Sequence, residues 1–85
     1  MRFIKFYAEW CGPCKAFEPV LEKYAEEHGL DILPIDIDKN PKTAERFGVM
    51  SVPTTVLMQD HEELARVVGA KPSFQLEQAF DKFMN

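Results

Sequence analysis

Two cysteines separated by two residues are the side chains of this sequence best suited to chemistry. Cys11 and Cys14 enclose Gly12-Pro13, and the chain has no other cysteine. They follow an apolar run that predicts a strand, and they precede a segment with helical periodicity. Two thiols at this spacing can cycle between a dithiol and a disulfide. The pair therefore indicates thiol–disulfide exchange as the reaction.

The alternative for the same cysteines is half of a zinc site. His28 and His61 are the chain's two histidines, so they would have to complete a set of four ligands. Their positions relative to Cys11 and Cys14 match no common zinc finger. We therefore favour thiol chemistry and expect no bound metal.

Length, composition and charge limit the kinds of protein that this chain can be. Its 85 residues, 46% of them hydrophobic, predict a single domain over residues 1–85 with a modest core. A formal net charge of −4 argues against nucleic-acid binding and offers no basic stripe to a membrane. No segment has the length of a membrane-spanning helix, and the first residues do not fit a signal peptide. We expect a cytoplasmic monomer, in a compartment where thiols are kept reduced.

The elements that must position the cysteines follow from periodicity and from proline and glycine. Residues 3–8 alternate between two faces and predict a strand. Pro13 favours the first turn of a helix, and apolar residues recur at helical spacing after it. We expect Pro19 to kink this helix and Gly29 to end it in a left-handed cap.

The rest of the chain predicts two more helices and three more strands. These are a strand over 32–37, a short helix capped by Asn40-Pro41 and ending near Gly48, a hairpin of strands 54–58 and 64–68 with a turn over 59–63, and a last helix from Ser73. Pro34 cannot donate a hydrogen bond to a neighbouring strand, so its strand is expected at a sheet edge. Leu76, Ala79, Phe80 and Phe83 form the predicted buried stripe of the last helix.

Several motifs, in one order, resemble the thioredoxin family over nearly the whole chain. The matching segments are Ala8-Glu9-Trp10-Cys11-Gly12-Pro13-Cys14-Lys15, Pro19, Asp38-Lys39-Asn40-Pro41, Val52-Pro53-Thr54 and Val68-Gly69-Ala70. The resemblance implies an α/β, thioredoxin-like fold with a four-stranded mixed sheet in the order 2-1-3-4. The last hairpin is antiparallel, three helices flank the sheet, and the N-terminal strand and helix that family members usually carry are expected to be lacking.

The roles of the two cysteines follow from their places at the start of a helix. Unpaired backbone N–H groups and the positive helix end stabilise a thiolate at Cys11, and the thiolate is the nucleophile. We expect Cys14 to be more buried and to resolve the mixed disulfide that Cys11 forms. Gly12 and Pro13 between them resemble the dipeptide of reducing family members. The expected redox group is the Cys11–Cys14 disulfide itself, with no bound cofactor.

A substrate-binding surface around Cys11 is implied by the resemblance. Pro53 is expected to follow a cis peptide bond and to face the cysteines, and the Val52 backbone is then suited to pairing with an extended substrate segment. Trp10, Gly69 and Ala70 are expected to complete an apolar collar suited to docking proteins. Met50 fits this collar and the core equally well.

Three residues depart from the family pattern. Lys5 stands where the family usually has a buried aspartate beneath the second cysteine, and Pro34 stands where the lysine partner of that aspartate usually lies. His61 occupies a hairpin position where glycine is common, so the turn is expected to differ. The usual proton route to Cys14 is therefore missing from this sequence.

Lys5 itself has two interpretations. In one, its stem packs against the protein and its ammonium reaches solvent. In the other, it lies beneath Cys14 and its charge lowers a thiol pKa, with Asp36 as an ion-pair partner on the same strand face. The first interpretation is slightly favoured by the sequence.

The sequence therefore predicts a thiol–disulfide oxidoreductase that reduces protein disulfides. The family analogy implies that a thioredoxin reductase, a flavoprotein using NADPH, recharges it. One alternative is a glutaredoxin-like electron donor dedicated to one enzyme, such as ribonucleotide reductase, which the small size supports and Gly12-Pro13 opposes. Another is an interaction subunit without redox turnover, in which Cys11→Ser would leave function intact.

Overall fold

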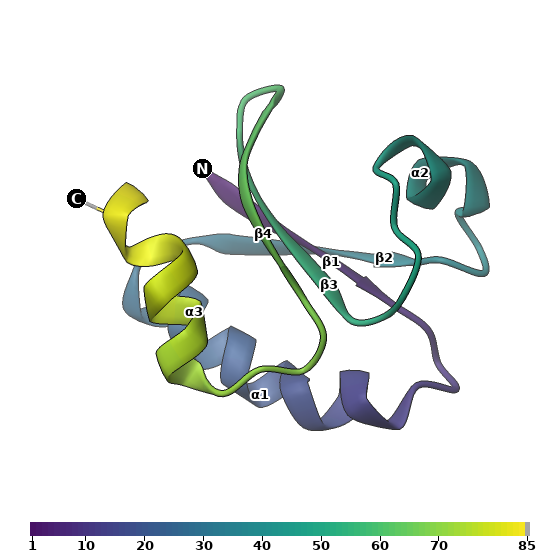
Figure 1. Ribbon diagram of the computed structural model, residues 1–85, viewed down its shortest axis with the longest axis horizontal. Coiled ribbons are helices and arrows are strands. Elements are labelled where there is room, and N and C mark those ends of the chain that lie inside the picture. The colour runs from purple at the N-terminus through teal and green to yellow at the C-terminus, as the bar shows by residue number, and fades with distance from the viewer. Residues whose placement is uncertain (85) are drawn as a thin grey trace.

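Four strands form one mixed sheet in the computed structural model, which describes residues 1–84. The strands are β1 (Arg2–Tyr7), β2 (Asp31–Asp36), β3 (Thr54–Gln59) and β4 (Glu62–Val68). Their order is β2-β1-β3-β4, with β1 parallel to β2 and antiparallel to β3, and β3 antiparallel to β4 (Figure 1). This confirms the predicted sheet, including the edge position of the strand that contains Pro34.

Helices lie on both faces of this sheet (Figure 1). The long helix α1 (Gly12–Glu27) and the helix α3 (Ser73–Phe80) cover one face, and the short helix α2 (Pro41–Arg46) covers the other. A 3₁₀ turn, Asp81–Phe83, follows α3. β1 therefore delivers the chain directly to the N-terminus of α1, at the end of the sheet where the two cysteines lie.

Gly29 ends α1 as predicted. It adopts a φ of 65°, in the left-handed region that glycine enters without a Cβ clash, and Leu30 N–H donates to Ala25 O at 2.9 Å. Pro19 lies inside the helix, which is continuous from Gly12 to Glu27. The kink expected at Pro19 stays a prediction.

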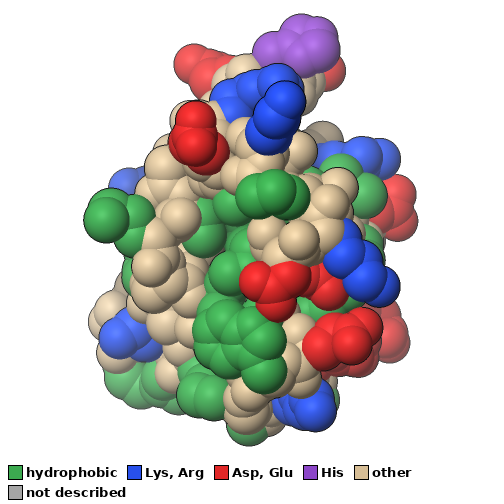
Figure 2. Space-filling model, turned by 90° about the vertical axis from the view of Figure 1, so that its right-hand side faces the viewer, with side chains coloured by type: hydrophobic (Ala, Val, Ile, Leu, Met, Phe, Trp, Pro, Cys, Tyr) green, Lys and Arg blue, Asp and Glu red, His purple; other side chains and the backbone are tan. Residues whose placement is uncertain are grey.

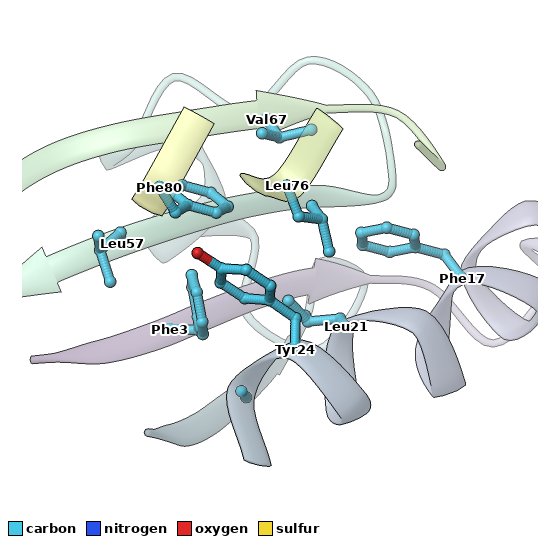
Figure 3. Packing of buried hydrophobic residues seen from close by; sticks show 9 residues of the cluster. Phe3, Phe17, Leu21, Tyr24, Leu57, Val67, Leu76 and Phe80 are labelled. Carbon is cyan, nitrogen blue, oxygen red and sulfur yellow. The ribbon is translucent and has the colours of Figure 1, made fainter. Parts of the chain in front are cut away.

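The main core joins β1 to α1 and α3. Figure 3 shows Phe3 of β1 packed against Phe80 of α3 and Tyr24 of α1, with ring centroids 5.0 Å and 6.0 Å from that of Phe3. Leu76 and Phe80 of the predicted stripe are buried, while Ala79 and Phe83 are half-buried. This core holds α1 in place against the sheet.

A polar cluster that was not predicted from the sequence lies at the C-terminal end of α1. The Tyr24 hydroxyl donates to Asp81 Oδ1 at 2.6 Å, and burial together with this bond raises the pKa of Tyr24 well above its usual range. His28 Nε2 lies 3.9 Å from Asp81 Oδ1. Tyr24 and His28 are 57 and 53 residues from Asp81 in sequence, so periodicity could not show the pairing.

Two local predictions need correction. Asn40 precedes α2, but its side chain does not cap that helix, because its Nδ2 donates instead to Asp36 O at 3.1 Å. The β3–β4 turn is shorter than predicted, since the strands extend to Gln59 and resume at Glu62. Asp60 takes the positive φ of 55° in this turn, a conformation that Asp tolerates better than most residues.

Candidate active site

Cys11 occupies the N-cap position of α1. Its backbone is extended, with φ −86° and ψ 105°, and its N–H donates to Ala8 O at 3.1 Å. The Cys14 N–H, one of the groups left without a partner inside the helix, donates to Cys11 Sγ at 3.1 Å. The sulfur thus takes the place that a Ser or Asp oxygen takes in other caps. A negative charge on this sulfur would be stabilised by that N–H and by the helix dipole.

The sulfurs of Cys11 and Cys14 are joined in a disulfide, with the two Cα atoms 5.3 Å apart. Both residues are buried, with exposed fractions of 3% for Cys11 and 5% for Cys14. The prediction that Cys14 is the more buried of the two is therefore wrong. The physical reason is that Cys11 Sγ lies against the Val52 carbonyl oxygen, 3.8 Å away, whereas Cys14 borders a pocket at the side of α1.

The segment before β3 faces the nucleophile. The Val52–Pro53 peptide bond is cis, as the resemblance implied, and Val52 O lies 3.8 Å from Cys11 Sγ. Gly69 N–H donates to Pro53 O at 2.7 Å, and Gly69 has a φ of 98°, a conformation that L side chains rarely adopt. Ala70 follows on the surface. The structure therefore brings Val52, Pro53 and Gly69 together beside Cys11.

Trp10 and Met50 are exposed at the same end of the molecule. Met50 is 97% exposed, so it does not fill the core. Trp10 Nε1–H donates to Asp38 Oδ2 at 2.8 Å, which fixes an exposed aromatic ring beside the cysteines. Figure 2 looks at this end and shows apolar side chains next to acidic ones. Asp38 belongs to a motif that matches the family. Because it is 28 residues from Trp10, its hydrogen bond to Trp10 could not be predicted from the sequence.

Lys5 points from β1 toward α1. Its Nζ lies 3.4 Å from Glu18 Oε2 and 5.4 Å from the centroid of the Tyr7 ring. The pairing of Lys5 with Asp36, which belonged to the second interpretation of Lys5, does not occur, because Asp36 Oδ1 instead accepts the Asp38 N–H at 2.8 Å. An aspartate at a strand end commonly bonds the backbone of its own turn in this way.

The Lys5–Glu18 ion pair lies in the pocket that Cys14 borders. This pocket has a volume of about 340 Å³ and is lined by Lys5, Tyr7, Ala8, Glu9, Cys14, Lys15 and Glu18. Glu18 was not predicted from the sequence, although one signal was available. Glu18 is four residues after Cys14, and residues at this spacing share one face of a helix.

The four side chains of the alternative zinc site do not form one cluster. Cys11 and Cys14 are bonded to each other, His28 lies at the far end of α1, and His61 lies in the β3–β4 turn. Among residues 1–84, no group of three or more His, Cys, Asp or Glu side chains is arranged to hold a metal ion. The same residues include no helix long and apolar enough to cross a membrane.

The fold and the site together define a class of protein. It is a small α/β redox protein in which two thiols close into a disulfide at a helix N-terminus, opposite a cis-proline. A family model described as Thioredoxin matches residues 1–82. The chain belongs to the thioredoxin family, and it is a thiol–disulfide oxidoreductase.

Individual relatives agree with this assignment. The thioredoxin of Staphylococcus haemolyticus is 43% identical over an alignment of 86 positions, which covers 99% of this chain and 83% of that protein. A mutant thioredoxin from Halobacterium salinarum superimposes with a TM-score of 0.87 at 38% identity, covering 98% of this chain and 74% of the other. Oxidized mitochondrial thioredoxin 3 from Saccharomyces cerevisiae gives a TM-score of 0.81 at 34% identity, with coverage of 93% and 76%.

Proposed function

We propose that this protein reduces disulfides in other proteins, with Cys11 as the nucleophile. The observation that carries the proposal is the position of Cys11 Sγ, which accepts the Cys14 N–H and lies 3.8 Å from Val52 O. The N–H and the helix dipole favour the thiolate in the reduced protein. A substrate segment that lies along the Val52 backbone would bring its disulfide to that thiolate.

The reaction proceeds through two exchanges. The Cys11 thiolate attacks one sulfur of the substrate disulfide, forms a mixed disulfide and releases the other sulfur as a thiolate. The Cys14 thiolate then attacks Cys11 Sγ, closes the intramolecular disulfide and releases the second substrate sulfur. The Cα separation of 5.3 Å lies within the range that a disulfide spans, so closure needs no large movement of the backbone.

Substrate docking is proposed to use the surface around the cis-proline. The backbone of Val52 pairs with an extended segment of the substrate, as an added strand pairs with a sheet edge. Pro53 and Gly69 hold that backbone through their 2.7 Å hydrogen bond, and the exposed Trp10 and Ala70 supply apolar contact beside it. Gly12 and Pro13, in the first turn of α1, keep the segment between the cysteines free of charge.

We propose that a thioredoxin reductase, drawing electrons from NADPH, re-reduces the protein, and membership of the thioredoxin family supports this. We propose that the protein works as a cytoplasmic monomer and binds no cofactor, its own disulfide being the redox group. The second candidate function is a glutaredoxin-like electron carrier, which glutathione would re-reduce.

Two re-reduction systems separate these functions. The oxidised chain is mixed with insulin and supplied either with NADPH and a thioredoxin reductase or with NADPH, glutathione and glutathione reductase. We expect insulin reduction with the first system only, and we expect Cys11→Ser to remove it. Turnover with glutathione alone would support the dedicated carrier, and a fully functional Cys11→Ser protein would support the subunit without redox turnover.

Lys5 is proposed to lower the pKa of Cys14 through its positive charge. In a Cys11→Ser background, where Cys14 is the remaining thiol, Lys5→Met is expected to raise the pH midpoint of alkylation by iodoacetamide by up to about 1 pH unit. Removing Lys5 takes away a cation and also leaves the Glu18 carboxylate without its partner. Lys23→Met, which removes the same charge elsewhere, is the control. An unchanged midpoint would show that Lys5 only packs.

A further inference from the structure

The pocket beside Cys14 contains an acid that the sequence pattern did not assign. Glu18 lies on α1 one turn after Cys14, and both residues line the same 340 Å³ pocket. A volume of this size admits several water molecules, each occupying roughly 30 Å³ in the liquid. A carboxylate and a thiol that share such a pocket can exchange a proton through water.

Lys5 holds this carboxylate in place. The Lys5 side chain is 12% exposed, and a largely buried ammonium group requires a counter-charge. Among the described residues, its one ion-pair partner is Glu18, with 3.4 Å between Nζ and Oε2. The ion pair therefore ties Glu18 to the mouth of the pocket, while its exposed fraction of 51% leaves it in exchange with solvent.

The other polar groups of the pocket are less suited to accept a proton from Cys14. Glu9 is exposed and directed at Lys39, with 3.9 Å between Oε1 and Nζ. Lys15 is a cation, and the Tyr7 ring packs under the Lys5 ammonium. Glu18 is thus the carboxylate that both borders the pocket and is positioned by a partner within it.

We propose that Glu18, positioned by Lys5, accepts the proton of Cys14 when the mixed disulfide is resolved. The inference rests on the proposed function, since it concerns the second exchange of that reaction. The S–H bond of Cys14 breaks and its proton passes through water to the Glu18 carboxylate. The Cys14 thiolate then attacks Cys11 Sγ, a new S–S bond forms, and the bond to the leaving sulfur breaks. The leaving thiolate carries away the electron pair, and Glu18 returns its proton to solvent.

A small aromatic disulfide allows the resolution of the mixed disulfide by Cys14 to be measured separately from the attack by Cys11. Dithiobis(nitrobenzoate) reacts with the reduced protein to release one coloured thiolate when Cys11 attacks and a second when Cys14 resolves the adduct. Stopped-flow absorbance between pH 6 and 9 therefore gives the two rate constants separately. Glu18→Gln is compared with Glu22→Gln, which removes the same charge from the same helix outside the pocket. Equal thermal unfolding midpoints will show that both variants are folded.

We expect Glu18→Gln to slow the second release about tenfold or more at pH 7 and to leave the first unchanged. The deficit should close above about pH 8.5, where a thiol ionises without help. Glu18→Asp should recover part of the rate. In a Cys11→Ser background, Glu18→Gln should lower the pH midpoint of Cys14 alkylation, because it removes a negative charge.

A slower resolution despite an easier ionisation is the signature of a proton acceptor. If Glu18 acted only through its charge, Glu18→Gln would speed the second release at pH 7, and that result would overturn the proposal. Equal second-phase rates in Glu18→Gln and Glu22→Gln would overturn it as well. Failure of the proposed function gives a different pattern, in which both phases occur with the small probe but insulin is not reduced.

Discussion

Cys14→Ser is expected to trap a protein substrate on Cys11 and to abolish multiple turnover. The serine hydroxyl cannot close the second disulfide, so the mixed disulfide between Cys11 and the substrate has no intramolecular exit. Turnover with insulin should fall by at least about 10³-fold, as in other enzymes that lose one member of a concerted pair. Denaturing mass spectrometry without reductant should show a covalent adduct that dithiothreitol releases.

Cys11→Ser is the matched control for the trap. It leaves Cys14, which borders the side pocket and acts only in the second exchange, so no stable adduct with the substrate is expected. An adduct of equal yield in Cys11→Ser would assign the attack to Cys14 and contradict the order of the two exchanges. Turnover by Cys14→Ser near the wild-type rate would show that the resolving thiol comes from elsewhere.

Phe3→Ala is expected to lower the free energy of unfolding by about 3–5 kcal/mol. Phe3 is fully buried and packs against Phe80 and Tyr24, so its removal opens a cavity where β1, α1 and α3 meet (Figure 3). Small domains are stable by about 5–15 kcal/mol, so this loss is a large share of the total. Urea unfolding of the oxidised protein, followed by circular dichroism, measures the change.

Phe74→Ala removes the same side chain from an exposed position of α3 and serves as the control. Its cost is expected to stay within about 0.5 kcal/mol, as for most surface changes. If the two variants were equally stable, the contact of β1 with the helices would not be what holds the fold together.

The missing family acid has a structural counterpart in this chain. The aspartate that the resemblance places on the first strand is replaced by Lys5, which reaches across to Glu18 on α1. An ion pair therefore lies beside the active-site helix, with its cation on β1 and its carboxylate on α1. This arrangement keeps an acid near Cys14 while placing it in contact with solvent.

Local rules were sufficient for most of the fold. Pro34 predicted an edge strand because a residue without an N–H cannot complete an interior strand, and β2 lies at the edge. Gly29 predicted the end of α1 because left-handed backbone suits glycine. The turn residue Asp60 escaped prediction, since several polar residues between 59 and 63 satisfy the same local preferences.

Contacts between distant segments were beyond the reach of such rules. The bonds of Trp10 to Asp38 and of Tyr24 to Asp81 join residues 28 and 57 positions apart. Periodicity assigns a side chain to a face of its own element, but it does not specify which side chain of another element lies opposite. For the same reason the sequence could not decide whether Lys5 pairs with Asp36, and the polar atoms of the two residues in fact have different partners.

The sequence by itself determined the chemistry of this protein, because Cys11 and Cys14 lie within one helical turn and their spacing is a local property. It also determined the order of the elements and, through the family resemblance, the cis-proline at Val52–Pro53. Only the tertiary structure decided what surrounds each sulfur. The Val52 carbonyl oxygen lies 3.8 Å from Cys11 Sγ, whereas Cys14 shares a pocket with Lys5 of β1 and Glu18 of α1. Such side-chain packing depends on all elements at once.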